Sequence, residues 1–193
     1  YMSDIRELSE VRAEIDAIDS KIRNLLMERM DCSYDVARAK IGSGDLTIYR
    51  PEREEEILRR LGNGISEDRK AAYLAVVRKI METSRMYQYG VIYDNCEEVS
   101  EKLFAGIRIP ADASRVKLRL ARPNRPNSMS AILSMIGDYG YNMECMERID
   151  AGTESEAVTF DLTVLGDLND VHMKKLMYQL SMESSGFRIL EVL

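Results

Sequence analysis

The chain has 193 residues, 45% of them hydrophobic, which is enough for one ordinary domain or two small ones with a buried core. Its formal net charge is −6 and it has no run of five or six basic residues, which argues against a general nucleic-acid-binding surface. No apolar run reaches the roughly 18 to 20 residues that a membrane span needs, and the N-terminus lacks a signal-peptide pattern. We therefore expect a cytoplasmic protein.

The sequence offers little for metal or thiol chemistry. Cys32, Cys96 and Cys145 are scattered and odd in number, which favours reduced thiols over a disulfide framework. His172 is the single histidine of the chain, and no Cys-x-x-Cys motif accompanies it. Because zinc sites need several such ligands at characteristic spacings, we expect no metal site.

Helical periodicity dominates the first half of the chain. Apolar residues recur at three- and four-residue steps, which predicts one long amphipathic helix over residues 3–41, ended by Gly42 and Gly44. Pro51 followed by several glutamates predicts a second helix over 51–61. The Gly62-Asn63-Gly64 turn and Ser66 as N-cap predict a third helix over 69–89 that continues past Gly90.

After about residue 110 the apolar pattern changes to the period of two that is typical of strands. The predicted order is strand 115–121, helix 127–138, strand 141–150, strand 157–165, helix 169–184 and strand 187–193. This βαββαβ order predicts a ferredoxin-like sandwich with both helices on one face of the sheet. We therefore expect a helical domain over 3–105 and an α/β domain over 114–193, separated by the Pro-containing stretch 106–114.

Two cations of the first helix share a face. Arg29 and Lys40 are eleven residues apart, an offset of only about 20° on a helix that turns about 100° per residue. Both lie beside the apolar stripe that includes Ile22, Leu25 and Val36, so we expect both to point inward. For a single cation, an exposed position at the rim or pairing with an acid is the more common outcome.

Arg12 cannot join Arg29 in a small pocket of the same helix. It lies seventeen residues earlier, which moves it about 25 Å along the axis at about 1.5 Å per residue. Arg12 is therefore either a surface residue or a contributor to the pocket of a second subunit.

Other polar pairs have an ordinary interpretation and a functional one. Ser84 and Gln88 are four residues apart on the third helix and face the same side. Arg53 and Glu54 lie in a highly charged run of the second helix. Each pair alone is typical of a solvated helix face. The sequence pattern by itself does not distinguish ligand-binding residues from ordinary surface residues here.

Taken together, these residues resemble the all-helical chorismate mutases, best known from bifunctional chorismate mutase/prephenate dehydratase enzymes. The resemblance covers roughly residues 8–89 and rests on the order and approximate spacing of Arg12-x-x-Ile15-x-x-Ile18-Asp19, Leu25-Leu26-x-Glu28-Arg29, Ala39-Lys40, Arg53-Glu54 and Ser84-x-x-x-Gln88. It implies intertwined homodimers of three-helix chains that convert chorismate to prephenate, without a cofactor, in aromatic amino-acid biosynthesis.

The resemblance also implies a role for each site residue. Arg12 of the partner subunit, Arg29 and Arg53 would clamp the two carboxylates of chorismate, with Ser84 assisting. Lys40 and Gln88 would donate to the ether oxygen. Glu54 would hold the ring hydroxyl. One departure is Arg50, which stands where the family commonly has an aspartate.

The second half resembles an ACT domain, a ferredoxin-like module that binds amino acids and regulates enzymes of their metabolism. The resemblance places an effector site at Asn127, Ser128 and Met129, with tyrosine or phenylalanine as the expected ligand. The phenylalanine-binding motifs of the dehydratase enzymes differ from this sequence. A purely structural dimerisation module is the alternative.

Two further functions compete with mutase activity. One is a related isochorismate-pyruvate lyase of the same helical class, and the other is a non-catalytic regulator that senses a metabolite. The attached ACT-like half favours amino-acid biosynthesis. Because only the 26 residues 90–115 separate the two halves, no dehydratase domain fits between them.

Overall fold

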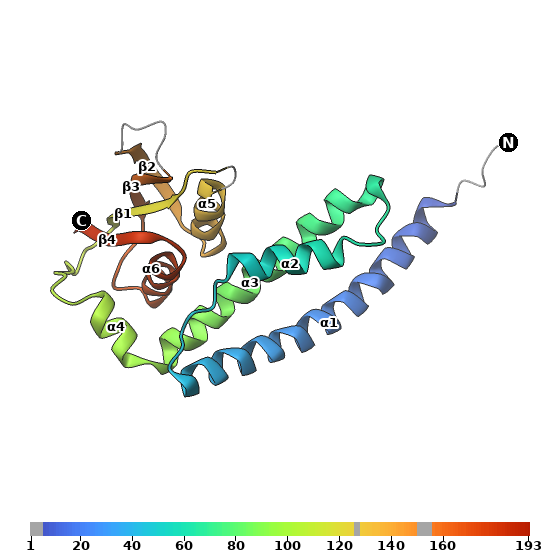
Figure 1. Ribbon diagram of the computed structural model, residues 1–193, viewed down its shortest axis with the longest axis horizontal. Helices are drawn as coiled ribbons and strands as arrows, with labels where there is room; N and C mark the ends of the chain where they lie inside the picture. Colours follow the sequence, from blue (N-terminus) through green and yellow to red (C-terminus); the bar gives the residue numbers. More distant parts are fainter. Residues whose placement is uncertain (1–5, 126–127, 150–155) are drawn as a thin grey trace.

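The computed structural model describes residues 6–125, 128–149 and 156–193. Three helices, α1 (Leu8–Ser43), α2 (Pro51–Leu61) and α3 (Glu67–Asn95), form the first half, and the short α4 (Glu97–Leu103) follows. Figure 1 shows α1, α2 and α3 extending away from the sheet at the other end of the molecule, whereas α4 lies near that sheet. None of the described helices is both long and apolar enough to cross a membrane.

The helix ends follow local chemistry. The α1 helix begins at Leu8 rather than at residue 3, because Glu7 is already extended at φ −61° and ψ 132°; residues 3–5 lie outside the described part. It ends at Ser43, where Gly44 adopts the left-handed conformation (φ 73°) and its N–H donates to the carbonyl of Ile41. Acids in the first turn of α2 and Arg59 and Arg60 in its last turn complement the helix dipole.

The third helix is longer than predicted. It starts at Glu67 after Ser66, whose carbonyl accepts from the N–H groups of Arg69 and Lys70, while its side chain makes no capping bond. It runs through Gly90 as expected and ends at Asn95. The α4 helix was not predicted, because its seven residues are too few to establish an apolar period.

The second half contains a four-stranded antiparallel sheet with the strand order β2-β3-β1-β4. Its elements occur in the predicted order: β1 (Arg115–Pro123), α5 (Ser128–Asp138), β2 (Asn142–Arg148), β3 (Ala157–Leu165), α6 (Val171–Glu183) and β4 (Ser185–Val192). The predicted ends at residues 127 and 150 lie outside the described residues. Asp170 caps α6 by accepting from the N–H of His172 at 2.9 Å.

Two hydrophobic clusters hold the molecule together. The larger joins one face of the sheet, including Leu118 and Leu162, to Ile132 of α5 and Leu176 of α6. The smaller contains Ala37 of α1, Tyr89 and Ile92 of α3, and Tyr178 of α6. Because this second cluster draws on both halves, α6 is packed directly against the helical half.

Candidate active site

Ser84 and Gln88 form a buried polar pair on α3, at the face that meets α1. Ser84 is 4% exposed and Gln88 is 8% exposed. The Gln88 Nε2 group donates to the Oγ of Ser84 at 3.1 Å and to its carbonyl at 3.2 Å. The Oγ of Ser84 lies 2.7 Å from the Oγ of Ser33 on α1. The sequence prediction missed Ser33, although it lies four residues after Arg29 and so belongs to the same face of the helix.

Two cations of α1, Arg29 and Lys40, are placed by helical steps on the same face as Ser33. Steps of four and three residues lead from Ser33 to the buried Ala37 and then to Lys40, which places Lys40 on the side facing α3. The side chain of Lys40 is 23% exposed, whereas Arg29 is exposed. The expectation that both cations point inward within one chain is therefore correct for Lys40 alone.

Lys40 is held by an acid that the sequence prediction missed. Its Nζ donates to Asp45 Oδ2 at 2.6 Å, and Arg50 donates to the same oxygen at 2.9 Å. The hydrogen bond from Lys40, together with the backbone N–H of Thr47, holds the pKa of Asp45 well below its ordinary value. Asp45 therefore stays ionised near Lys40, and Arg50 is directed toward this acid.

The apolar stripe of α1 is not buried within the chain, contrary to the expectation from its sequence. Ile15, Ile18, Ile22 and Leu25 are between 45% and 64% exposed. In the described residues, the buried side chains of α1 are instead Ser33 and Ala37. The reason is geometric: α1 packs on α3 along one side, which leaves the stripe open. Arg12 lies exposed beyond this stripe, near the start of the same continuous helix.

On α2 the two predicted residues differ in environment. Arg53 is exposed, whereas Glu54 is half-buried and accepts from Arg85 Nη1 at 2.5 Å. Burial raises the pKa of Glu54, and the neighbouring guanidinium of Arg85 counteracts this effect. Arg85 directly follows Ser84, so α3 brings the Ser84–Gln88 pair and the partner of Glu54 to adjacent positions.

The comparison with known proteins identifies the helical half. Residues 11–89 match the family model described as chorismate mutase type II, and this range contains all seven candidate site residues. Residues 11–89 form a chorismate mutase type II domain.

Three curated relatives are similar to part of this chain. Two are named bifunctional chorismate mutase/prephenate dehydratase: one from Pseudomonas aeruginosa is 37% identical over 42% of this chain, and one from Stutzerimonas stutzeri is 38% identical over 31%. The third, named chorismate mutase, from Methanocaldococcus jannaschii, is 44% identical over 30% of this chain. The matched regions cover 24%, 18% and 57% of these relatives' own lengths.

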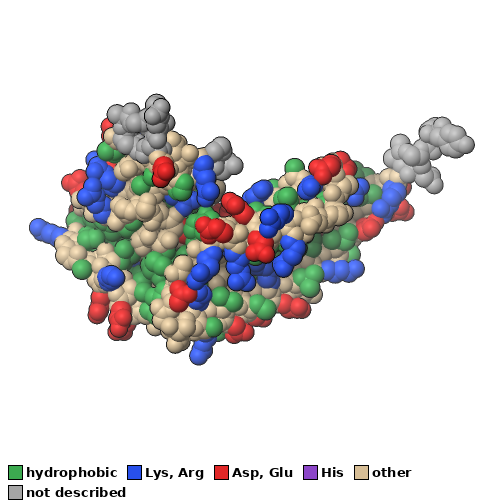
Figure 2. All heavy atoms as spheres, in the orientation of Figure 1, with side chains coloured by type: hydrophobic (Ala, Val, Ile, Leu, Met, Phe, Trp, Pro, Cys, Tyr) green, Lys and Arg blue, Asp and Glu red, His purple; other side chains and the backbone are tan. Residues whose placement is uncertain are grey.

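A cavity of about 290 Å³ lies where the mutase domain meets β1 and α5. Glu54 and Arg85 line it from the mutase domain, and Arg122 and Ser128 line it from the second half. Figure 2 shows acidic and basic side chains gathered over α2, where that helix approaches the second half. A candidate site residue and a candidate effector residue therefore share one cavity.

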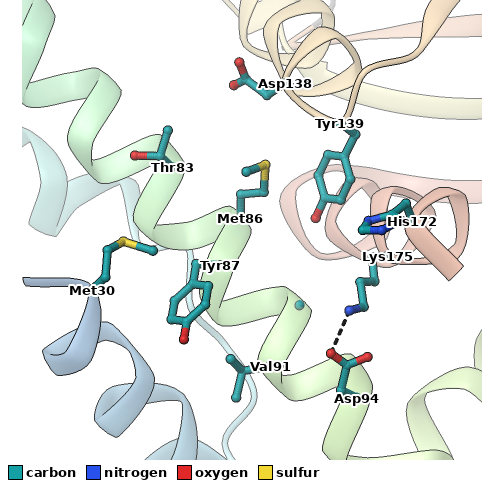
Figure 3. Close-up of a pocket in the computed structure, with 11 residues that line it drawn as sticks. Met30, Thr83, Met86, Tyr87, Val91, Asp94, Asp138, Tyr139, His172 and Lys175 are labelled. Atoms are coloured by element: carbon teal, nitrogen blue, oxygen red, sulfur yellow. Dashed lines mark hydrogen bonds and ion pairs between the residues drawn. The ribbon is translucent and has the colours of Figure 1, made fainter. Parts of the chain in front are cut away.

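A second cavity, of about 370 Å³, lies between α3 and the second half. Figure 3 shows Met86 and Tyr87 of α3 on one side and Tyr139 and Lys175 on the other. Lys175 donates to Asp94 at 2.6 Å, which ties α6 to α3. The single histidine, His172, also lines this cavity.

Two of the three predicted effector-site residues, Ser128 and Met129, lie at the start of α5. Ser128 is buried, and its carbonyl accepts from Arg122 Nε at 3.3 Å. Met129 is half-buried against the larger hydrophobic cluster, and Asn127 lies outside the described residues. Within the described ranges, no group of three or more His, Cys, Asp or Glu side chains is arranged to hold a metal ion.

Proposed function

We propose that this chain is a chorismate mutase, an isomerase that rearranges chorismate to prephenate. The observation that carries the proposal is the buried Ser84–Gln88 pair, facing the side of α1 that presents Lys40, in a domain of the chorismate mutase type II family. The reaction is intramolecular and requires no nucleophile, base or metal. Donors of fixed geometry and positive charge are sufficient for it.

Substrate binding is assigned to the arginines. Chorismate carries two carboxylates, and guanidinium groups recognise carboxylates by paired, charge-assisted hydrogen bonds. In the proposed site Arg29 and Arg53 act from one subunit and Arg12 acts from its partner. Their exposure in the single chain agrees with side chains that become ordered around a dianion.

Charge stabilisation is assigned to Lys40 and Gln88, which donate to the ether oxygen as its bond to carbon breaks. A lysine ammonium carries three donor hydrogens, so the bond to Asp45 leaves others for the substrate. The primary amide of Gln88 carries two donor hydrogens, both of which are directed at Ser84 in this structure, so a bond to the ether oxygen replaces one of these contacts when the substrate binds. An acceleration of about 10⁶-fold requires about 8 kcal/mol, which several donors held in a dry site can supply.

We further propose that the active site is shared within a homodimer. The exposed apolar stripe on α1 supports this assembly, since a second copy of the chain would cover it. In an antiparallel crossing of two such helices, Arg12 of one subunit approaches Arg29 of the other. The distance along one helix, about 25 Å, excludes the same encounter within a chain.

The division into a mutase domain over 3–105 and an ACT-like regulatory domain over 114–193 is also a proposal. The antiparallel sheet with two helices on one face is compatible with a ferredoxin-like ACT fold. An aromatic amino acid, tyrosine or phenylalanine, is the proposed effector, with Ser128 and Met129 as candidate contacts. A structural role for this half is the competing proposal.

The deciding experiment incubates the purified chain separately with chorismate and with isochorismate. We expect prephenate from chorismate and neither salicylate nor pyruvate from isochorismate. Salicylate and pyruvate formation would instead support the lyase. Absence of both reactions would support a non-catalytic regulator.

A further inference from the structure

Arg85 of α3 lies between two carboxylates that belong to different halves of the chain. Its Nη1 donates to Glu54 of α2 at 2.5 Å. Its Nε and Nη2 donate to the two carboxylate oxygens of Glu183 on α6, at 2.9 and 3.3 Å. One guanidinium therefore connects a candidate substrate-binding residue directly to the second half.

This chain of charges is well removed from solvent. The side chain of Glu183 is 1% exposed, that of Arg85 is 10% exposed and that of Glu54 is 24% exposed. Burial lowers the pKa of Arg85, but the two carboxylates outweigh this effect and raise it above its ordinary value. Arg85 is therefore a permanent cation held between two acids.

The second half fixes the position of Glu183. Gln179 Nε2 donates to Glu183 Oε1 at 2.9 Å. The hydroxyl of Tyr139, the residue directly after α5, donates to Gln179 Oε1 at 3.0 Å. Arg122 of β1 donates to the backbone carbonyl of Glu183. Since Glu183 is bonded through both its side chain and its backbone, it presents Arg85 with a fixed anion.

Tyr49 supports Arg85 from the mutase side. The Arg85 guanidinium carbon lies 4.8 Å from the centre of the Tyr49 ring, and the backbone N–H of Tyr49 donates to the hydroxyl of Tyr89 at 3.1 Å. The guanidinium is thus restrained by an aromatic ring as well as by two carboxylates. Because the Arg85 guanidinium is held in place, it fixes the orientation of the Glu54 carboxylate.

A contribution to folding stability does not by itself explain the buried ion pairs among Glu54, Arg85 and Glu183. Buried ion pairs often contribute no more to stability than apolar residues of the same size, because desolvating the charges is costly. The contact between α3 and α6 already contains an apolar element, the edge-to-face pair of Tyr89 and Tyr178 with ring centres 5.6 Å apart. What the ion pairs add is a defined position for a carboxylate of the mutase domain.

We propose that Arg85 is a positioning residue for Glu54 and that Glu183 sets the position of Arg85, so that the second half controls how the mutase site holds its substrate. The assignment rests on the proposed function, in which Glu54 binds the ring hydroxyl of chorismate. A movement of α6 relative to α3 displaces Glu183 first and Glu54 second. This is a direct physical route from the second half to the active site, and energetic coupling is its test.

The experiment is a double-mutant cycle in the full-length chain, with steady-state kinetics for chorismate. We expect Arg85→Gln to raise KM about 10-fold while kcat changes less than about 3-fold, because the loss is in substrate binding. Arg85→Lys should recover part of the loss. When Glu54→Gln is already present, adding Arg85→Gln should change KM by less than about 2-fold.

Glu183→Gln tests the contribution of the second half. It keeps one acceptor oxygen, to which Arg85 Nε and Gln179 can still donate, but it removes the anion and the second oxygen that accepts from Arg85 Nη2. We therefore expect a KM increase of about 3- to 10-fold that disappears when Arg85→Gln is present. Lys175→Gln is the matched control, because it breaks another α6–α3 ion pair, that with Asp94, which does not contact Glu54. Its KM should stay at the level of the unchanged protein.

The results separate failure of this assignment from failure of the proposed function. Prephenate formation by the unchanged protein, combined with an Arg85→Gln effect that persists in Glu54→Gln protein, would reject the positioning role alone. Equal KM increases from Lys175→Gln and Glu183→Gln would also reject it, because a general weakening of the contact between α3 and α6 would then explain both.

Absence of prephenate from the unchanged protein would reject the proposed function and this assignment with it. If Arg85→Gln does not fold, Glu183→Gln decides.

Discussion

The Oγ atoms of Ser33 and Ser84 lie 2.7 Å apart and join the C-terminal part of α1 to the centre of α3. Gln88 Nε2 is a donor only, so the Ser84 oxygen accepts from it and can give its own hydrogen to Ser33. The Ser33 hydroxyl then donates to the carbonyl of Arg29 at 3.0 Å. This series of bonds therefore connects Ser84 and Gln88 to the backbone of the helix that carries Arg29 and Lys40.

Ser33→Ala tests this connection. Removing the hydroxyl leaves the buried Ser84 hydroxyl without its partner on α1, and we expect a loss of about 1 kcal/mol in the free energy of unfolding. We also expect a higher KM for chorismate, since Ser84 assists in substrate binding. Urea unfolding and steady-state kinetics provide the two measurements.

Ser20→Ala is the matched control for Ser33→Ala. Ser20 makes the same bond to the carbonyl four residues earlier, at 2.9 Å to Asp16, but it is exposed. An equal loss of stability in the two variants would show that the bond to Ser84 contributes nothing.

Lys40→Ala and Gln88→Ala should each lower kcat more than they raise KM. The reason is that their proposed hydrogen bonds strengthen as negative charge develops on the ether oxygen, which is a transition-state effect. Removing one such donor typically costs about 10²-fold or more in kcat. Lys21→Ala, at an exposed lysine of the same helix, is the control and should have normal kinetics. Unchanged turnover in Lys40→Ala or Gln88→Ala would remove that residue from the mechanism.

Arg12→Ala and Arg29→Ala proteins should each be inactive alone and partly active when mixed. In a mixed dimer with shared sites, one site contains both mutations and the other keeps both arginines. We expect recovery of up to about a quarter of normal activity, since half of the dimers are mixed and each has one intact site. Native mass spectrometry would verify that subunits have exchanged. Exchange without recovered activity would place both arginines in the same chain's site.

The periodic parts of the fold could be predicted from the sequence, and the contacts between periodic segments could not. The spans of α2 and β3 agree with the prediction at both ends, because proline, glycine and strict alternation mark their limits. The α4 helix was missed because it spans less than two full turns. The sequence pattern of α1 correctly indicated an apolar stripe but wrongly placed it inside the chain, since a pattern does not specify which molecule covers it.

For the candidate site, the sequence pointed to the residues that belong to a motif and missed the residues that are defined by their contacts. The family spacing pointed to Ser84, Gln88 and Lys40. In the structure Ser84 and Gln88 are buried and Lys40 is partly buried, and their role in catalysis stays a prediction. Ser33 and Arg85 were missed because each is defined by a partner from a distant segment, which a linear pattern does not reveal. Asp45 was missed because it lies in the loop after α1, where no helical period connects it to Lys40. Arg85 in particular looks like one more charge on a charged helix until Glu183, 98 residues away, is placed beside it.

Tyr178→Phe should stabilise the protein. The hydroxyl of Tyr178 is buried and has no hydrogen-bond partner among the described residues. Removing it relieves an unsatisfied polar group while the ring keeps its edge-to-face contact with Tyr89, so we expect a gain of about 1 kcal/mol in the free energy of unfolding. A loss of stability would show that the hydroxyl is satisfied.

The same residue predicts part of the response to alkaline pH. Burial raises the pKa of Tyr178 from 10.0 to about 12. A raised pKa in the folded state means that its contribution to stability is complete below pH 10 and is lost as the pH rises toward 12. Urea unfolding between pH 9 and pH 11 should therefore show a weaker decline of stability with pH for Tyr178→Phe than for the unchanged protein.

Binding of an aromatic amino acid to the second half should raise the melting temperature and alter mutase kinetics. At a ligand concentration about 100 times Kd, binding to the folded state alone adds about 2.7 kcal/mol of stability, which is about 5 to 10 °C for a chain of this size. Tyrosine and phenylalanine are the first ligands to titrate, with an aliphatic amino acid as the control.

If Ser128 contacts the ligand, Ser128→Ala should weaken binding about 5-fold. Ser181→Ala is the control and should not weaken binding, because the Ser181 hydroxyl bonds to the carbonyl of Tyr178 within α6. A shift in melting temperature with unchanged kinetics would indicate binding without regulation, and no response to any amino acid would favour the structural role. If regulation does occur and passes through Arg85, the ligand should alter KM in the unchanged protein and not in Arg85→Gln, because binding at the two sites would then be linked through that side chain.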